Sequence, residues 1–410
     1  MRNYGYVRFC YPEERVKIIQ HGYRTIILGR NKDGSIESRK ILIPEKYLIP
    51  LSRAKDKKLT GWESYDIMEA GNRFESLKIL CKRAGWNQTE QDLNELLHLA
   101  RHSYYLAYIG VDKYEIPLGS GALVDLGDEI SWISMILVHP EVRRQGIAAS
   151  LFYHCLHNAR AGGKNRILGL DATPEGKMLY IQMGFEKSFS IFRCSVPTHL
   201  YDTETTEILL EPINHFDCIR DYLQQRGFEE RETLFRSLIK LSEGGCFVFR
   251  KNKQITGFVM SRPGALKPYA GPLVADDEKT AKRLLAKVLE YWNQRDIEQI
   301  LMDVPAIWLN IKPSGNSKVD PEFELPFPIK EGFLRGSQVL RTFDRMYQLI
   351  SSENLSVVFD FLSDSITQKD EINRLLSESE KNYTKTKNYL EKEKNEMLRY
   401  QYAIGGPEFS

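Results

Sequence analysis

The stretch VHPEVRRQGIAASLF (residues 138–152) joins an apolar run to a helix-like segment through a proline, two arginines and a glycine. A turn between a strand and a helix needs only the glycine, so the arginines require a second reason. The first turn of a helix leaves backbone N–H groups without partners, and its dipole favours an anion there. Arg143 and Arg144 add charge-assisted hydrogen bonds to phosphate oxygens, while Gly146 lets the backbone approach a bulky ligand. The stretch therefore predicts a turn that binds a diphosphate.

Two common phosphate-binding patterns are missing from the sequence. Neither GxxxxGK[ST] nor GxGxxG occurs in the chain, so nucleotide hydrolysis and Rossmann-type hydride transfer lose support. After the glycine, apolar residues at helical spacing define one buried face: Ile147, Leu151, Cys155 and Leu156. The turn therefore opens a helix.

The composition is that of an intracellular protein with more than one domain. Its 410 residues exceed one ordinary core, 42% of them are hydrophobic, and the net charge is only +2. The six cysteines form no CxxC pair and no metal-ligand spacing, which favours reduced thiols and no metal site. We find no signal-peptide pattern and no apolar run near the roughly 18 residues of a membrane span. We therefore expect a cytoplasmic protein with no membrane partner.

Residues 64–200 alternate strand and helix patterns. Their order predicts β-α-α-β-β-β-α-β-α-β, a mixed α/β layout around one sheet. Gly85 separates the first two helices, and Asn87 or Thr89 is expected to cap the second. A partial repeat begins near Glu207, with a hairpin, a strand, a helix and two later strands in the same order. We therefore expect tandem domains of one fold class.

The two ends of the chain differ from this core in composition. Residues 1–62 read as short strands and contain 14 Lys and Arg against 6 acids, which makes them a basic block. Residues 351–400 carry one apolar stripe in heptads, which predicts a helical arm, and residues 401–410 predict a short strand-like segment. The basic block leaves nucleic acid, tRNA included, as a partner that we do not favour. The arm is a candidate contact for a homodimer.

The quoted stretch belongs to a larger pattern. WISMILVHPEVRRQGIAASLF, followed by LGLDATPEGKMLYIQMGF, resembles the donor-loop and tyrosine-helix motifs of the GNAT N-acetyltransferase superfamily. AGWNQTEQDL and GPLVADDEKTA resemble a two-domain bacterial subgroup in which a second, degenerate GNAT-like domain follows the catalytic one. The implied fold is α/β (α+β), with tandem GNAT-like mixed sheets and flanking helices. The predicted domains are residues 1–62, 63–200, 205–347, 351–400 and 401–410.

The resemblance implies acyl-CoA, most simply acetyl-CoA, as the donor. In this family a bulge in the strand before the turn separates two neighbouring strands. Main-chain groups on that strand bind the pantetheine arm, and N–H groups of the turn hold the pyrophosphate. The residues implied for donor binding are Leu137, Val138, Arg143, Arg144, Gln145, Gly146, Ile147 and Ala148.

The resemblance also suggests catalytic and acceptor residues. Tyr180 lies where the family often uses a tyrosine to protonate the departing thiolate, which a neutral phenol can do. Asp171, at a strand end, is the best-placed carboxylate for a general base. Trp86 and Asn87 fall in the helical region that lines the acceptor side. The alternatives are structural: Tyr180 and Trp86 as packing residues, and Asp171 as a cap of the next turn.

The repeat differs from the first domain at the donor turn. Where the first has HPEVRRQGIAA, the second has VADDEKTAKRL, without the glycine and with three acids. Like charge should abolish CoA binding there. We therefore predict an N-acetyltransferase that moves acetyl from acetyl-CoA to a primary amine of a small molecule by direct attack. The alternatives are a tRNA-dependent aminoacyl or acyl transferase and a non-catalytic acyl-CoA-binding regulator.

Overall fold

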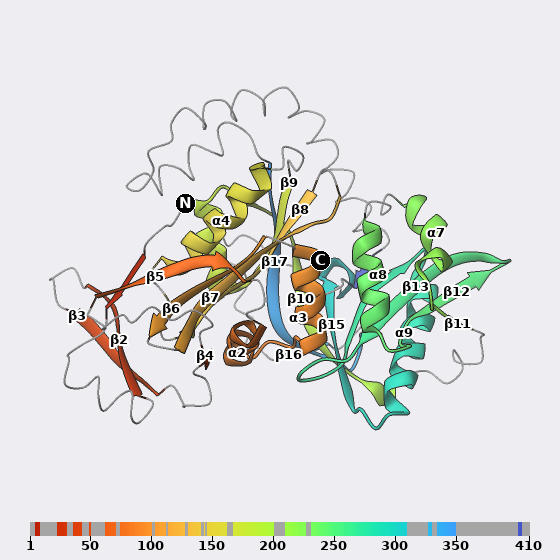
Figure 1. Cartoon of the computed structure of the whole chain (residues 1–410). Coiled ribbons are helices and arrows are strands. Elements are labelled where there is room, and N and C mark those ends of the chain that lie inside the picture. Colours follow the sequence, from red (N-terminus) through yellow and green to blue (C-terminus); the bar gives the residue numbers. More distant parts are fainter. Residues whose placement is uncertain are drawn as a thin grey trace, which may run out of the picture. The chain divides into compact units, whose positions relative to one another are not determined.

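A computed structural model describes residues 5–8, 23–30, 36–42, 49–50, 62–70, 74–100, 103–111, 114–127, 130–140, 143, 146–161, 167–200, 210–226, 231–309, 327–329, 334–349 and 401–403. The predicted helical arm, residues 351–400, lies outside them. The chain divides into two compact units: Met1–Val124 with Ile133–Gly163, and Asp125–Trp132 with Lys164–Ser410. Figure 1 labels many of the described helices and strands of both units. No helix of the described part of the chain is long and apolar enough to cross a membrane.

The first unit is an antiparallel sheet with helices. In chain order it contains β1 (Gly5–Arg8), β2 (Tyr23–Arg30), β3 (Ile36–Leu42), β4 (Ile49–Pro50), β5 (Trp62–Glu69), α2 (Phe74–Ala84), α3 (Glu90–Ala100), β6 (Tyr104–Val111), β7 (Tyr114–Asp125), most of β8 (Ile130–Val138) and α4 (Ile147–Ala161). β2 and β3 pair as a hairpin, while β1 pairs with β5 and β4 with β7. β1 and β4 of the basic block therefore extend the sheet of this unit, whereas β2 and β3 form a separate two-stranded sheet.

Helix α4 buries the face that its sequence predicts. Ile147, Leu151, Cys155 and Leu156 are all at most 1% exposed. A Cβ atom on Gly121 of β7 would meet Leu151 and Cys155, so α4 lies against that strand. The glycine thus allows the close helix–sheet contact that places the start of α4 next to the end of β8.

The second unit holds the remaining elements. They are β9 (Ile167–Ala172), α5 (Pro174–Gln182), β10 (Glu186–Pro197), β11 (Glu211–Pro212), α7 (Arg220–Gln224), α8 (Glu232–Leu241), β12 (Phe247–Lys251), β13 (Gln254–Arg262), β14 (Tyr269–Ala275), α9 (Glu278–Asn293), β15 (Gln299–Pro305), β16 (Phe327–Pro328), β17 (Gln338–Leu349), β18 (Gln401–Ala403) and three short 3-10 turns. The order β5-α2-α3-β6-β7-β8-α4-β9-α5-β10 confirms the prediction for residues 64–200. The hairpin β12–β13, followed by β14, α9, β15 and β17, confirms the partial repeat.

The two repeats exchange their last strands, which the sequence did not predict. β17 of the second repeat pairs antiparallel with β9 and with β10 of the first repeat. β10 pairs in turn with β15 of the second repeat. Figure 1 shows β17, in blue, beside β9 and β10. Because of these shared ladders, β9, α5 and β10 group with the second repeat and not with β5–β8.

A buried aspartate–arginine pair fastens each exchanged strand. Arg345 of β17 lies opposite Asp171 of β9, and its Nε and Nη2 donate to the two carboxylate oxygens at 2.8 Å each. Arg193 of β10 lies opposite Asp303 of β15, and its Nε and Nη2 donate to that carboxylate at 2.8 and 2.7 Å. The two pairs are symmetric: each joins the aspartate strand of one repeat to the last strand of the other.

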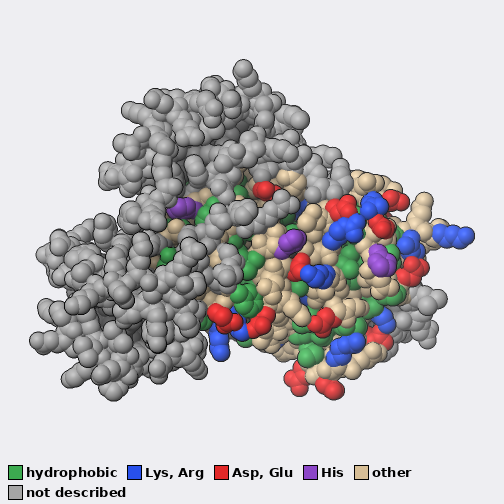
Figure 2. Space-filling model, viewed as in Figure 1, with side chains coloured by type: hydrophobic (Ala, Val, Ile, Leu, Met, Phe, Trp, Pro, Cys, Tyr) green, Lys and Arg blue, Asp and Glu red, His purple; other side chains and the backbone are tan. Residues whose placement is uncertain are grey.

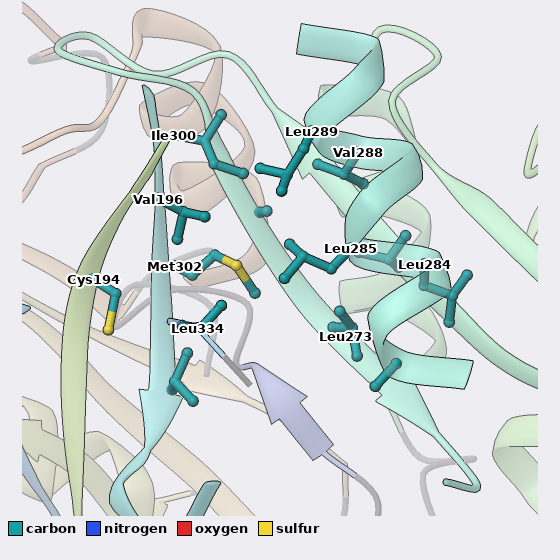
Figure 3. Packing of buried hydrophobic residues seen from close by; sticks show 14 of the residues in the cluster. Cys194, Val196, Leu273, Leu284, Leu285, Val288, Leu289, Ile300, Met302 and Leu334 are labelled. Carbon is teal, nitrogen blue, oxygen red and sulfur yellow. The ribbon is translucent and has the colours of Figure 1, made fainter. Parts of the chain in front are cut away.

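The core of the second repeat lies between α9 and the strands β10, β14 and β15. Figure 3 shows Leu285 and Leu289 of α9 directed toward the strand that carries Ile300 and Met302. Ile300 and Met302 are fully buried, as is Val288 of α9. Burial of each such side chain contributes about 1.5–3 kcal/mol. Since Cys194 and Val196 of β10 join the same cluster, the first repeat completes the core of the second.

We expect Arg345→Met to lower the free energy of unfolding by about 3–5 kcal/mol, because it leaves the buried Asp171 carboxylate without a counter-charge. Arg341→Met on the same strand is the control. Arg341 is 34% exposed and lies 3.6 Å from the exposed Glu175, so its loss should cost less than about 1 kcal/mol. Urea unfolding of the full chain measures both. Equal losses for the two variants would contradict the structural role of the buried pair.

Candidate functional site

Strand β8 is interrupted where the resemblance implies a bulge. Its parallel ladder with β9 ends at Trp132 opposite Gly169. Three residues further on, Met135 has a φ of 54°, in the left-handed region that a methionine rarely adopts. The buried Ser120 hydroxyl of β7 donates to the Met135 carbonyl at 2.9 Å. The interruption is therefore built into the first unit and held by a neighbouring strand.

The residues after the bulge keep one edge against β7. A Cβ atom on Gly119 would lie 2.6 Å from the Leu137 carbonyl oxygen, so only a glycine fits at this position. The His139 N–H donates to the Leu118 carbonyl at 2.7 Å. Leu137 is buried and Val138 half-buried. The Leu137 carbonyl therefore faces β7, and the donor contacts predicted for Leu137 and Val138 stay predictions.

The predicted diphosphate turn ends at a glycine with a left-handed backbone. Gly146 has a φ of 80°, and its carbonyl accepts the Ser150 N–H at 2.9 Å, so it is the residue that opens α4. A Cβ atom there would meet no described atom within 4 Å. Glycine is thus required by the backbone conformation and not by crowding. The first turn of α4 contains no acidic residue, which leaves its N–H groups suited to an anion.

The other members of the predicted turn are partly described. Arg143 is exposed, and its Nε donates to the Val138 carbonyl at 3.3 Å. Ile147 is buried under the turn and Ala148 is half-buried. Arg144 and Gln145 lie outside the described residues. The structure therefore brings Arg143, Val138 and the start of α4 into one local arrangement.

A half-buried histidine, His139, lies beside the turn. Burial, together with the charges of Arg83 and Arg143, lowers its pKa to about 4. Arg83, in the last turn of α2, was not among the residues predicted for the site. At neutral pH the imidazole is uncharged, and the two arginines supply the local positive charge.

The predicted acceptor residues lie in a tightly held connection between α2 and α3. Gly85 has a φ of 66°, its N–H donates to the Lys82 carbonyl, and the Trp86 N–H donates to the Cys81 carbonyl. This double hydrogen bond is a Schellman motif, which ends α2. Trp86 is half-buried, which leaves part of its ring available to a ligand.

Helix α3 begins with a reciprocal cap. The Asp92 N–H donates to the Thr89 hydroxyl at 3.1 Å, and the Thr89 N–H donates to the Asp92 carboxylate at 2.7 Å. Of the two predicted caps, Thr89 is therefore the residue found, which leaves Asn87 for another role. Asn87 and Gln88 are both buried in the connection. The Gln88 Oε1 atom has no hydrogen-bond donor among the described residues.

Asp171 is engaged in a way that the sequence did not predict. Its side chain is 1% exposed, and both oxygens accept from Arg345, whose guanidinium also lies 4.6 Å from the centre of the Trp132 ring. The helix that follows is capped by Thr173, whose hydroxyl accepts the Gly176 N–H, so Asp171 is not the cap. This geometry gives Asp171 a structural partner, and its role as general base stays a prediction.

Tyr180 lies on α5 with its ring largely buried. It is 8% exposed and packs edge-on against Phe185, with the ring centroids 6.2 Å apart. A Cβ atom on Gly176 would lie 3.1 Å from the ring, so the glycine makes room for it. The helix position agrees with the predicted motif, and the catalytic role of Tyr180 stays a prediction. Tyr180 and Asp171 belong to the second unit, and the predicted donor-turn and acceptor residues to the first.

Two family models match the chain in separate segments. The model described as "Acetyltransferase (GNAT) family" matches residues 72–185. The model described as "Acetyltransferase (GNAT) domain" matches residues 223–314. The first covers β8, the turn and α4, and the second covers β14 and α9. Both repeats therefore match the same kind of domain.

Parts of the chain are also similar to curated proteins and to a solved structure. Cysteine-rich protein 2-binding protein of mouse is 29% identical over 116 residues, which are 28% of this chain and 14% of the relative. Its human counterpart is 28% identical over 116 residues, again 28% of this chain and 14% of the relative. The chain thus spans about a seventh of the length of these relatives. A structure from Pyrococcus horikoshii, solved as a candidate acetyltransferase, has 18% identity and a TM-score of 0.51, covering 72% of this chain and 93% of the other. It supports the fold.

We expect His139 to make stability depend on pH. Its pKa is about 4 in the folded chain and near 6.5 when unfolded, so between these values only the unfolded state binds the proton. Stability should therefore fall as the pH drops from 6.5 to 4. His139→Gln should flatten this part of the profile in urea unfolding, whereas replacement of the exposed His199 by Gln should leave it unchanged. An unchanged slope in His139→Gln would contradict the burial effect.

Proposed function

The chain belongs to the GNAT acetyltransferase superfamily and carries two GNAT domains, and we propose that its first domain transfers acetyl from acetyl-CoA to a primary amine of a small molecule. The family membership makes it an N-acetyltransferase. The donor, the acceptor class and the roles of single residues are our proposal. Its support comes from the donor strand and turn of the first unit.

One arrangement carries the proposal: the bulge at Met135 followed by the open turn at Gly146. In this proposal the bulge turns main-chain groups of the strand around Leu137 and Val138 toward the amides of a pantetheine arm, and the Arg143 side chain moves off the Val138 carbonyl when the donor binds. The start of α4 offers N–H groups to the pyrophosphate, and a glycine has no side chain to compete for them. Arg143 and Arg83 add positive charge near His139, where both contribute to its lowered pKa after burial. A donor with amides and a diphosphate fits these features.

The chemistry is a direct transfer within a ternary complex. The amine nitrogen bonds to the acetyl carbon, the carbon–sulfur bond breaks, and the departing thiolate takes a proton from the Tyr180 hydroxyl. The nitrogen releases one proton to water, and the Tyr180 phenolate takes a proton back from water. Asp171 is left out of this scheme because Arg345 occupies both of its oxygens. On the acceptor side, Trp86, Asn87 and the free Gln88 Oε1 are proposed to contact the amine substrate, whose N–H groups can donate to that oxygen.

The alternative of a tRNA-dependent transferase depends on the basic block, residues 1–62, whose side chains lie outside the described residues. Figure 2 shows Lys and Arg interspersed with Asp and Glu over the described residues of one face. A diphosphate turn serves a CoA donor and not a tRNA donor, so we favour acetyl-CoA. A screen of polyamines, aminoglycosides, amino acids and aminoacyl-tRNA with acetyl-CoA would identify the acceptor.

We also propose a cytoplasmic location. Five cysteines among the described residues, Cys81, Cys155, Cys194, Cys218 and Cys246, are free thiols. Free thiols persist in a reducing compartment. The proposed homodimer contact through residues 351–400 falls outside the described part of the chain.

We expect Gly146→Glu to weaken acetyl-CoA binding by at least about 100-fold, or about 2.7 kcal/mol, because it strains the turn and places a carboxylate beside the pyrophosphate. The control is Gly244→Glu, which puts the same side chain at another glycine with a φ of 91° and open surroundings. Calorimetry with acetyl-CoA measures both. Unchanged affinity in Gly146→Glu would remove the turn from the donor site.

We expect Tyr180→Phe to lower kcat by about 100-fold or more while the acetyl-CoA affinity changes little, because only the proton donor is lost. Steady-state kinetics on an acceptor from the screen and calorimetry separate the two effects. An unchanged melting temperature shows that packing against Phe185 is kept. Equal turnover in wild type and variant would exclude Tyr180 as the acid.

A further inference from the structure

The second repeat contains a strand that corresponds to the donor strand β8. β14 pairs in parallel with β15 at Tyr269 and Leu301, as β8 pairs with β9 at its start. The register between β13 and β14 shifts at Gly271 and Pro272, which lie two and three residues beyond that pair. Met135 lies three residues beyond Trp132 in β8. β14 therefore keeps both features of a donor strand, the short parallel ladder and the interruption after it.

The edge of β14 beyond this interruption is occupied by the chain itself. β18 pairs antiparallel with β14, with Ala403 opposite Leu273 and Gln401 opposite Val274. β13 already pairs with the other edge at the same two residues. β18 also contacts β15. It therefore lies in the gap that opens between β14 and β15 after Tyr269.

This place is the counterpart of the proposed pantetheine site. Counted from the last parallel pair, Val274 of β14 corresponds to Leu137 of β8. In β8 the main-chain groups at this position are proposed to bind the amides of the donor. In β14 the corresponding main-chain groups lie next to the backbone of β18. A β-strand offers the same amide N–H and C=O groups as a pantetheine arm.

The start of α9, which corresponds to the proposed pyrophosphate site at the start of α4, is also occupied by groups of the chain. Two residues separate α9 from β14, and Asp277 caps the helix by accepting the Thr280 N–H at 2.7 Å and the Thr280 hydroxyl at 3.1 Å. Asp276 accepts from the Tyr222 hydroxyl at 2.9 Å and pairs with Arg226. A carboxylate thus takes the position that an anion would take at the start of α4.

We propose that β18 replaces the donor arm in the second GNAT domain, so that the chain closes its own second donor groove and binds one acetyl-CoA, in the first domain. The assignment of that one site rests on the proposed function. The closure itself depends only on the pairing of β18 with β14 and on the acidic cap of α9.

The pairing is tested in the full chain with Gln401→Pro/Ala403→Pro, which removes two backbone N–H groups from β18. Gln401→Ala/Ala403→Ser is the control, because it changes the same side chains and keeps both N–H groups. Amide hydrogen exchange of a peptide covering Tyr269–Ala275 should be at least about tenfold faster in the proline variant and unchanged in the control. Equal protection in the proline variant and wild type would overturn the closure.

Calorimetry with acetyl-CoA tests the number of sites separately. The wild type should bind one acetyl-CoA per chain, and Gly146→Glu should leave no second site. A second acetyl-CoA bound by the wild type would contradict the closed groove. Wild-type binding in Gly146→Glu together with faster exchange of β14 in the proline variant would reject the proposed donor turn and leave the closure standing.

Discussion

Two buried aspartate–arginine pairs hold the strands that the GNAT repeats exchange. Transfer of a carboxylate and a guanidinium out of water is costly, and only bidentate geometry offsets the cost. The pairs therefore stabilise one register above all. A slip by a single residue turns each side chain to the other face of the sheet and leaves both charges buried alone. Asp171 and Asp303 thus specify how β9, β10, β15 and β17 fit together.

This constraint explains why a carboxylate at the end of β9 resembled a catalytic base. Asp171 stands next to motif residues and ends a strand, which is where catalytic carboxylates are common. Its partner, Arg345, comes from the second repeat. Asp303 occupies the corresponding place in β15 and makes the same contact with Arg193. Because the second repeat has lost the donor turn and keeps the pair, the pair serves the architecture of both repeats.

Local patterns predicted the elements but not their partners. The helical spacing of Ile147, Leu151 and Cys155 and the glycine before them were enough for the donor turn and α4, since these depend on neighbours in sequence. The Schellman motif at Gly85 and the cap at Thr89 are local in the same way. The exchange of β17 and β10 joins residues far apart in the chain, and no short stretch encodes it. The segment RTFDRMY, which contains Arg345, carried no signal for the partner of this arginine.

The exchange also sets the order in which the chain can complete its fold during synthesis. Asp171 leaves the ribosome 174 residues before Arg345. Until Arg345 is synthesised, the edge of β9 that pairs with β17 has no strand beside it, and the Asp171 carboxylate has no guanidinium to pair with. Contacts of such long sequence separation form late and slowly. The first repeat is therefore unable to finish as an independent nascent domain, and both repeats reach the native state together, with an unpaired strand edge exposed to aggregation in the interval.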